Sequence, residues 1–226
     1  NRAKNDPENK YALFIDEINR GNIANIFGEL ITLIEPDKRK GMDNALSVKL
    51  PYSKSIFSVP NNLDIIGTMN TADRSVEALD TALRRRFEFV EMLPNSSLLS
   101  DISCEGINLE GLLNVINNRI EKLLDKDHQI GHSYFMSKSN KLSISELRDV
   151  FKNKIMPLLQ EYFYGDFGKI GLVLGEGFIE ENKDNTIFAK FKYEDRDLID
   201  ERKVYQISDL TKLSVSNFKS IYEKSE

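Results

Sequence analysis

The sequence predicts an α/β protein that begins with a parallel sheet and its flanking helices, continues into a helical region and ends in a small α+β tail. Short apolar runs at residues 13–15 and 63–69 end in polar residues and alternate with helical patterns, which is typical of strands and helices in a parallel sheet. Apolar residues then recur at helical spacing between residues 109 and 163. Strand patterns return at residues 186–191 and 204–207.

The first strand is predicted from Leu13, Phe14 and Ile15, an apolar run that is too short for a helix. Such a run fits a strand that is buried on both faces, as in a parallel sheet. Asp16 and Glu17 follow at its carboxyl end, where open α/β sheets bind their ligands. Two adjacent carboxylates suit phosphoryl transfer, because the first can hold Mg²⁺ and the second can polarise an attacking water. The alternative is a strand that ends in two solvated acids.

The next segment reads as a helix with an apolar stripe from Ile23 to Ile34, which Pro36 stops after Glu35. Residues 37–44 are basic, and we expect a solvated charged turn or, alternatively, a loop that faces a pore or a neighbouring subunit. Residues 45–59 contain β-branched and aromatic residues around a polar centre, which predicts a β-hairpin. This hairpin either contacts a partner or decorates the surface.

The second strand ends at Asn70, whose neutral amide can orient a water molecule against a terminal phosphate without adding charge. The alternative is an asparagine that caps the next turn. A helix follows and ends in Arg84, Arg85 and Arg86, where the helix dipole favours cations. Three arginines together suggest a cation aimed at a neighbour's phosphates, with Arg85 and Arg86 as candidates and Arg84 as a structural residue. Residues 87–90 alternate and fit the last strand of the sheet.

These motifs together resemble a AAA+ nucleotide hydrolase, in which the corresponding parts are Walker B, sensor 1 and the arginine finger. The exact residues of these motifs make the family assignment more specific. Residues 14–22 read Phe-Ile-Asp-Glu-Ile-Asn-Arg-Gly-Asn, residues 67–75 read Gly-Thr-Met-Asn-Thr-Ala-Asp-Arg-Ser, and residues 82–87 read Ala-Leu-Arg-Arg-Arg-Phe. Residues 10–95 are thereby similar to McrB-like proteins, the GTP-hydrolysing AAA+ subunits of methylcytosine-specific restriction systems. The resemblance extends more loosely to about residue 175.

The resemblance implies a role for each candidate residue. Asp16 helps to hold Mg²⁺, Glu17 activates water, Asn70 positions it, and Arg85 or Arg86 stabilises charge on a neighbour's nucleotide. The following pair, Asp73 and Arg74, orients neighbouring groups around the nucleotide or bridges to the next subunit.

The implied nucleotide is GTP (or ATP), and the implied assembly is a ring of copies, expected to be a hexamer. The implied partners are an McrC-like nuclease subunit and modified DNA, the latter bound through an N-terminal domain outside this chain. Two alternatives stay open: a MoxR-like AAA+ ATPase with a chaperone or remodelling role, and a catalytically silent assembly module.

The phosphate-binding motif Gly-x-x-x-x-Gly-Lys-Ser/Thr of such enzymes does not occur in the sequence. We therefore expect a fragment that lacks the Walker A region and is inactive alone. The expected domains are a partial AAA+ core at residues 1–95, a helical lid at residues 96–165 and a C-terminal extension at residues 166–226.

The helical region is predicted from its caps. Asn108 precedes an amphipathic stripe that begins at Leu109, and Ser143 with Glu146 forms a capping box that opens a second helix. We expect this second helix to bend at Pro157 and to end at Gly165.

The remaining features give no further chemistry. His128 and His132 stand four residues apart, but two histidines are too few for a zinc site, and a lid segment near the nucleotide is the better interpretation. The glycine-rich stretch at residues 165–177 is expected to be a loop with a short apolar segment, and residues 216–222 a closing helix.

The composition bounds the class of protein. The chain has 226 residues, a formal net charge of -5 and 40% hydrophobic residues, which is typical of one or two soluble globular domains. No apolar run is long enough to span a bilayer and there is no secretory signal, so we expect a cytoplasmic protein without a membrane partner. Cys104 is the only cysteine, which excludes an internal disulfide. The mild acidity argues against a large uniform DNA-binding face.

Overall fold

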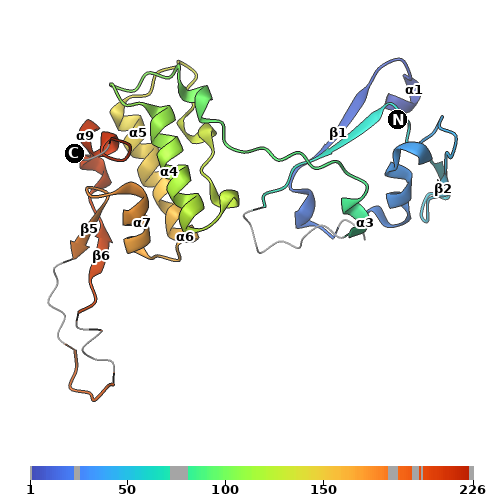
Figure 1. Cartoon of the computed structure of the whole chain (residues 1–226). Coiled ribbons are helices and arrows are strands. Elements are labelled where there is room, and N and C mark those ends of the chain that lie inside the picture. Colours follow the sequence, from blue (N-terminus) through green and yellow to red (C-terminus); the bar gives the residue numbers. More distant parts are fainter. Residues whose placement is uncertain are drawn as a thin grey trace. The chain divides into compact units, whose positions relative to one another are not determined.

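The structure is a computed structural model, and it describes residues 2–22, 26–71, 81–182, 188–194, 199 and 201–223. The chain forms two compact units, Asn1–Glu91 and Met92–Glu226. Figure 1 shows both, with the parallel strands in the first unit and the packed helices in the second.

A pair of parallel strands forms the centre of the first unit. Strand β1 (Tyr11–Ile15) lies beside β4 (Leu63–Gly67), with Tyr11 opposite Leu63 and Ile15 opposite Gly67. This register confirms the predicted parallel arrangement and brings the carboxyl ends of both strands to one edge. The prediction that the first strand is buried on both faces is wrong, since Leu13 and Phe14 are 45% and 70% exposed. The physical reason is that β4 is the only described strand that pairs with β1, so the described elements leave much of both faces uncovered.

A small apolar cluster packs beneath the carboxyl ends of these strands. Ile18 and Leu83 are its buried members. Partly buried residues complete the cluster: Ile15, Phe27, Ile31, Met69 and Phe87.

The side-chain amide of Asn62 connects the N-terminal segment to the start of β4, because it donates hydrogen bonds to the backbone oxygens of Ala3, Asp6 and Asn9.

The helix predicted after β1 is confirmed at its described residues, but it changes type: residues 26–27 are α-helical and continue into a 3₁₀ helix, η2 (Gly28–Ile34). Gly28 has a φ of 49°, a left-handed conformation that interrupts regular α-helical geometry at that point. The helix ends before Glu35 and Pro36, as predicted. The strand predicted at residues 87–90 is wrong, because these residues form no ladder with a neighbouring strand.

The predicted hairpin is confirmed in a shorter form. Strands β2 (Val48–Lys49) and β3 (Ile56–Phe57) pair antiparallel, with Val48 opposite Phe57. The other elements of the first unit are helix α1 (Arg2–Asn5), the 3₁₀ helices η1 (Ile18–Arg20) and η3 (Pro36–Lys38), and helix α3 (Thr81–Arg84).

Helices dominate the second unit, and the predicted caps are confirmed. The Asn108 side chain accepts a hydrogen bond from the Gly111 amide at the start of α4 (Leu109–Leu123). Ser143 and Glu146 form a capping box at the start of α5 (Ile144–Val150). The chain then passes through a π-helical turn, η7 (Phe151–Ile155), into α6 (Met156–Tyr162). The short 3₁₀ helices are η4 (Ser96–Leu99), η5 (Lys126–His128), η6 (His132–Phe135) and η8 (Leu210–Lys212).

One apolar core joins helices α4–α6 to the C-terminal residues. The ring of Phe151 lies 5.4 Å from that of Phe178 and 5.1 Å from that of Phe218, measured between centroids. All three side chains are fully buried. On α4, the buried amide of Asn117 donates to the Ile130 backbone oxygen and accepts from its backbone N–H. Residues beyond 166 therefore pack into the same core as the helices before them.

Two predictions for the tail are wrong. The glycine-rich stretch contains an α-helix, α7 (Phe167–Leu174), which Asp166 caps and Gly175 follows with a φ of 89°. The strand expected at residues 186–191 is not found at its described positions, 188–191; β6 (Val204–Ile207) pairs with β5 (Ile179–Asn182) instead. The last helix is α9 (Val215–Lys219), close to its predicted place.

Across the described ranges, no helix is both long enough and apolar enough to cross a lipid bilayer.

Candidate nucleotide-hydrolysis site

The candidate site lies at the carboxyl edge of β1 and β4, where backbone hydrogen bonds hold the two strand ends together. The Thr68 amide donates to the Ile15 oxygen at 3.0 Å, and the Ile18 amide donates to the Thr68 oxygen at 2.8 Å. These two bonds bracket Asp16 and Glu17. The geometry therefore fixes the backbone of both predicted acids against the end of the second strand.

Thr68 also connects the two strand ends through its side chain. Its hydroxyl donates a hydrogen bond to Oδ1 of Asp16 and accepts one, at 3.2 Å, from the backbone N–H of Glu17. Sequence reasoning missed this residue. The signal that could have revealed it is a hydroxyl side chain directly after the second strand, in line with the acid after the first.

Glu17 has a left-handed backbone conformation, with φ of 50° and ψ of 51°. This region is uncommon for residues other than glycine and clusters at functional sites. Its carboxylate forms an ion pair with Nε of Arg20, and the Arg20 amide donates to the Glu17 oxygen at 2.9 Å. Both side chains are more than half exposed, so the carboxylate is accessible while Arg20 directs it. Sequence reasoning did not anticipate the contribution of Arg20.

The end of β4 packs closely on the residue after Glu17. A Cβ atom placed on Gly67 would lie 2.9 Å from Cδ1 of Ile18. Ile18 is only 4% exposed, so a side chain at Gly67 meets an atom with little room to move. Close backbone approach at this point requires glycine.

The remaining predicted residues after β4 are only partly described. Asn70 lies three residues beyond the end of β4 and is exposed. Asp73 and Arg74 lie outside the described residues.

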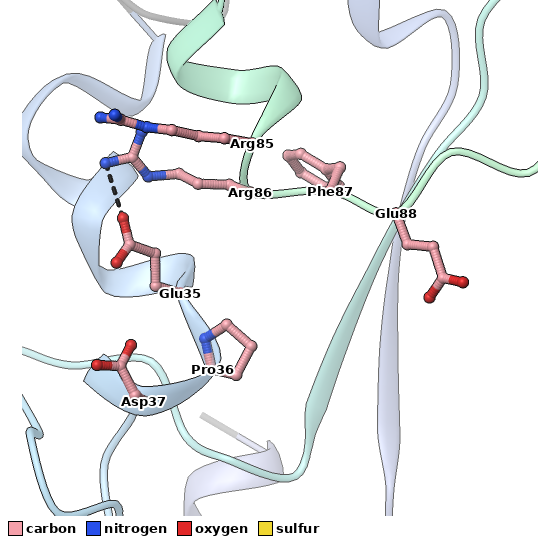
Figure 2. Close-up of a pocket in the computed structure, with 7 residues that line it drawn as sticks. All are labelled: Glu35, Pro36, Asp37, Arg85, Arg86, Phe87 and Glu88. Carbon is pink, nitrogen blue, oxygen red and sulfur yellow. Dashed lines mark ion pairs between the residues drawn. The ribbon is translucent and has the colours of Figure 1, made fainter.

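The three arginines at the end of α3 occupy three different environments. The guanidinium of Arg84 lies 5.6 Å from the centroid of the Phe89 ring, a cation–π contact that suits a structural role. Arg86 forms an ion pair with Glu35, with 2.8 Å between Nη2 and Oε1, and its side chain is 8% exposed (Figure 2). Arg85 is exposed, and no acid of the described residues pairs with its guanidinium.

A hollow of about 720 Å³ lies beside these arginines. Figure 2 shows Arg86 directed at Glu35, while the side chain of Glu88 points away from that pair. Asp37 stands near its neighbour Lys38, and the hydrogen bond from Lys38 lowers the pKa of the Asp37 carboxyl. The residues that line the hollow are Glu35, Pro36, Asp37, Arg85, Arg86, Phe87 and Glu88.

The basic segment after Pro36 is not simply a solvated turn. Arg39 is partly buried, and its Nε and Nη2 donate to the Ile34 oxygen at 3.1 and 3.0 Å. Its Nη1 donates to the Leu63 oxygen at the start of β4. The expectation of a charged turn is therefore wrong for Arg39, because backbone oxygens from two elements bind the guanidinium.

The two histidines of the second unit have local partners. Nδ1 of His128 lies 2.6 Å from Oδ1 of Asp125, and its ring meets Tyr162 edge-on. Nδ1 of His132 accepts a hydrogen bond from the Asn95 amide. No group of three or more potential metal ligands occurs in the described part of the chain.

The oxygen atoms at the strand ends fit a hard divalent cation. Asp16 and Thr68 present a carboxylate and a hydroxyl at an exposed edge, and oxygen donors of this kind are those that Mg²⁺ prefers.

Comparison with known proteins finds a matching family for part of each unit. Residues 2–87 match the family described as the AAA domain of the dynein-related subfamily, and residues 108–171 match the α-helical lid domain of McrB. The chain is 40% identical, over 183 residues, to the type IV methyl-directed restriction enzyme EcoKMcrB subunit of Escherichia coli strain K12. It is 28% identical, over 170 residues, to the type II restriction enzyme BsuMI component YdiS of Bacillus subtilis strain 168.

These alignments cover 73% and 67% of this chain, but only 39% and 48% of the two relatives. The chain thus spans less than half the length of the curated relatives it matches. The matched families confirm the predicted fold, a partial AAA+ core with parallel strands and flanking helices followed by a helical lid. On these grounds the chain belongs to the AAA+ family, as an McrB-like member.

Proposed function

We propose that the protein is a nucleoside triphosphate hydrolase that uses GTP and drives a modification-dependent DNA restriction complex. The observation that carries the proposal is the parallel register of β1 and β4, which sets Asp16 and Glu17 beside Thr68. The similarity to restriction-system proteins supports the biological setting.

In the proposed mechanism Asp16 and Thr68 would hold Mg²⁺, which would supply positive charge that neutralises the phosphate oxygens. Glu17, directed by Arg20, accepts a proton from the attacking water. Asn70 orients that water without adding negative charge near the phosphates. Asp73 and Arg74 bind around the nucleotide or bridge to the next subunit.

A neighbouring copy supplies the cation that completes the site. The proposal assigns this role to Arg85, because Arg86 already forms an ion pair with Glu35 of its own unit and Arg84 lies over Phe89. An arginine supplied across an interface stabilises charge that develops on the phosphoryl oxygens, and such a residue is worth roughly 10³–10⁵ in rate.

The proposed assembly is a ring, expected to be a hexamer, with an McrC-like nuclease subunit and modified DNA as partners. The preference for GTP over ATP is proposed from the similarity to McrB alone. No described residue is assigned a contact with the nucleotide base. A MoxR-like ATPase or a silent assembly module would have the same strand register, so nucleotide preference and turnover decide between them.

The deciding experiment is Glu17→Gln in the complete protein. We expect nucleotide binding within about twofold of the wild type and hydrolysis reduced by at least about 10², because only proton transfer is removed. Glu8→Gln, which removes another exposed carboxylate of the same unit, is the matched control and should keep full turnover. Undiminished hydrolysis by Glu17→Gln would exclude the assignment.

Mixed assemblies test the neighbouring arginine. Arg85→Ala subunits should be inactive alone and should regain activity when mixed with Glu17→Gln subunits. In such mixtures an intact Arg85 meets an intact Glu17 at some interfaces. Lack of any rescue would argue against a cation supplied in trans.

A further inference from the structure

We infer that Glu35 is a positioning residue that, through its ion pair with Arg86, sets the direction in which Arg85 reaches a neighbouring copy. The inference rests on the proposed function, in which Arg85 is the cation supplied in trans. It adds a residue from another part of the chain, on the segment between η2 and η3, to the machinery of hydrolysis.

The ion pair is well placed to fix the arginine segment. Arg86 is 8% exposed and Glu35 is 30% exposed, so solvent screens this pair less than an ordinary surface pair. The Arg86 amide also donates to the Leu83 oxygen at 2.9 Å, and Leu83 belongs to the buried cluster of the first unit. Arg86 is thereby fastened at its backbone and at its guanidinium. Arg85 is the preceding residue, so its backbone cannot rotate independently of that anchor.

Glu35 is itself held by the fold. It has an extended backbone and precedes Pro36, whose ring restricts the conformation of the residue before it. Arg39 binds the oxygen of Ile34, the residue before Glu35, through two nitrogens. The same guanidinium binds the Leu63 oxygen at the start of β4. A continuous series of contacts therefore links β4 to Glu35, and Glu35 to Arg86.

The charges around the hollow explain why this pair separates the two arginines. Arg85 and Arg86 both line the hollow, together with Glu35 and Asp37. Asp37 forms an ion pair with Lys38, whereas Glu35 forms one with Arg86. Glu35 is therefore the carboxylate of the hollow that binds an arginine. Because Glu35 binds Arg86, the exposed guanidinium of Arg85 is the one available to an incoming phosphate. In Figure 2 the ion pair of Glu35 is drawn to Arg86.

The inference makes a kinetic prediction for Glu35→Gln in the complete protein. Glutamine keeps a hydrogen-bond acceptor for Arg86 but removes the charge that fixes it. We expect kcat to fall about tenfold with KM changed less than about twofold, because Arg85 acts on charge that develops in the transition state. Asp37→Asn is the matched control: it neutralises a carboxylate of the same hollow that does not hold an arginine, and it should leave both constants unchanged.

Two readouts separate positioning from a general effect on the fold. First, Arg85→Ala and the double variant Arg85→Ala with Glu35→Gln should have the same residual rate, because Glu35 acts through Arg85. Second, Glu35→Gln subunits should regain activity when mixed with Glu17→Gln subunits, whose arginine segment is intact. The exchange of charges, Glu35→Arg with Arg86→Glu, should restore at least part of the kcat that Glu35→Gln loses.

The outcomes distinguish this inference from the proposed function. If Arg85→Ala hydrolyses nucleotide at the wild-type rate, the proposed role of Arg85 fails, and the inference fails with it. If Arg85→Ala is defective but Glu35→Gln is fully active, or if the two losses multiply in the double variant, only the inference is overturned. Should Glu35→Gln not fold, Glu35→Asp replaces it in every comparison, because it keeps the charge and shortens the reach to Arg86.

Discussion

Gly67→Ala is expected to damage both the stability of the first unit and the candidate hydrolysis site. The new Cβ would lie 2.9 Å from Cδ1 of Ile18, 3.1 Å from its Cγ2 and 3.3 Å from its Cβ. Overpacking of this kind costs about 1–3 kcal/mol. Restriction of the unfolded chain offsets about 0.4–1 kcal/mol of that cost, because Gly67 lies in a strand without a positive φ. The midpoints of these two ranges give an expected net loss of about 1.3 kcal/mol.

The same substitution should reduce hydrolysis, because Ile18 follows Glu17 directly and its amide donates to the Thr68 oxygen. A shift of Ile18 moves the carboxylate of Glu17 away from its position. If Glu17 has its proposed catalytic role, even a small displacement is costly, so we expect kcat to fall by about tenfold or more while nucleotide binding persists.

Urea unfolding and a steady-state hydrolysis assay of the same variants measure both effects. Ile18→Val removes the Cδ1 atom that the new methyl group meets, and alone it costs about 0.5–1.5 kcal/mol. The double variant should be more stable than the sum of the two losses by at least about 0.5 kcal/mol. Gly171→Ala is the control, since its nearest neighbours lie at an ordinary 3.6 Å and alanine favours its helix. Simple additivity of Gly67→Ala and Ile18→Val would refute the steric reasoning.

Three further predictions concern the second unit. Asn117→Ala should lower the free energy of unfolding by about 2 kcal/mol or more, since it leaves two buried backbone partners unpaired, whereas the exposed Asn118→Ala on the same helix should change it by less than about 0.5 kcal/mol. Burial raises the pKa of the Cys104 thiol to about 11, so a thiolate-specific reagent at pH 8 should label the folded protein far more slowly than the urea-unfolded chain, and equal rates would contradict that burial. The pKa of Asp209 is lowered to about 2, first by a hydrogen bond from a threonine hydroxyl, and lies below its unfolded value of 3.8. The stabilisation by Asp209 is therefore present above about pH 4 and lost as the pH falls to about 2, so the difference in Tm between the wild type and Asp209→Ala should shrink over that range; a constant difference would disprove the linkage.

The sequence carried enough information to predict that the two strands of the first unit run parallel and end at the same edge. Short apolar runs separated by helical patterns imply parallel strands, and parallel strands end at the same edge. That reasoning placed Asp16 and Glu17 correctly against the end of β4. It could not supply Thr68 or Arg20 as their partners, because a hydrogen bond between strand ends depends on side-chain direction rather than on periodicity.

The three arginines show what a sequence pattern cannot predict, namely which of several like residues has which role. A run of like residues after a helix gives each the same local signal, and the dipole of the helix favours them all. Their separate environments arise from Phe89 and Glu35, the second of which lies far from them in sequence. Only the fold brings Glu35 to Arg86.

Glycine misled the predictions in two places. Residues 165–177 looked like a loop, but Asp166 caps a helix there and Gly171 packs at ordinary distance against Ile179. Gly28, with its left-handed backbone, accompanies a change of helix type that the apolar stripe did not reveal. In both cases the decisive fact was the backbone conformation of one residue, which composition does not specify.

The exposed apolar side chains of β1 and β4, together with the strand edges of this two-stranded sheet, have a practical consequence for handling the protein. Phe14 and Ile66 are 70% and 42% exposed on a sheet of two described strands. An unpaired strand edge with apolar neighbours is a template onto which another polypeptide backbone can add. Preparations of this chain at high concentration are therefore expected to scatter light and to lose monomer over time. A charged residue in place of Phe14 should delay that loss.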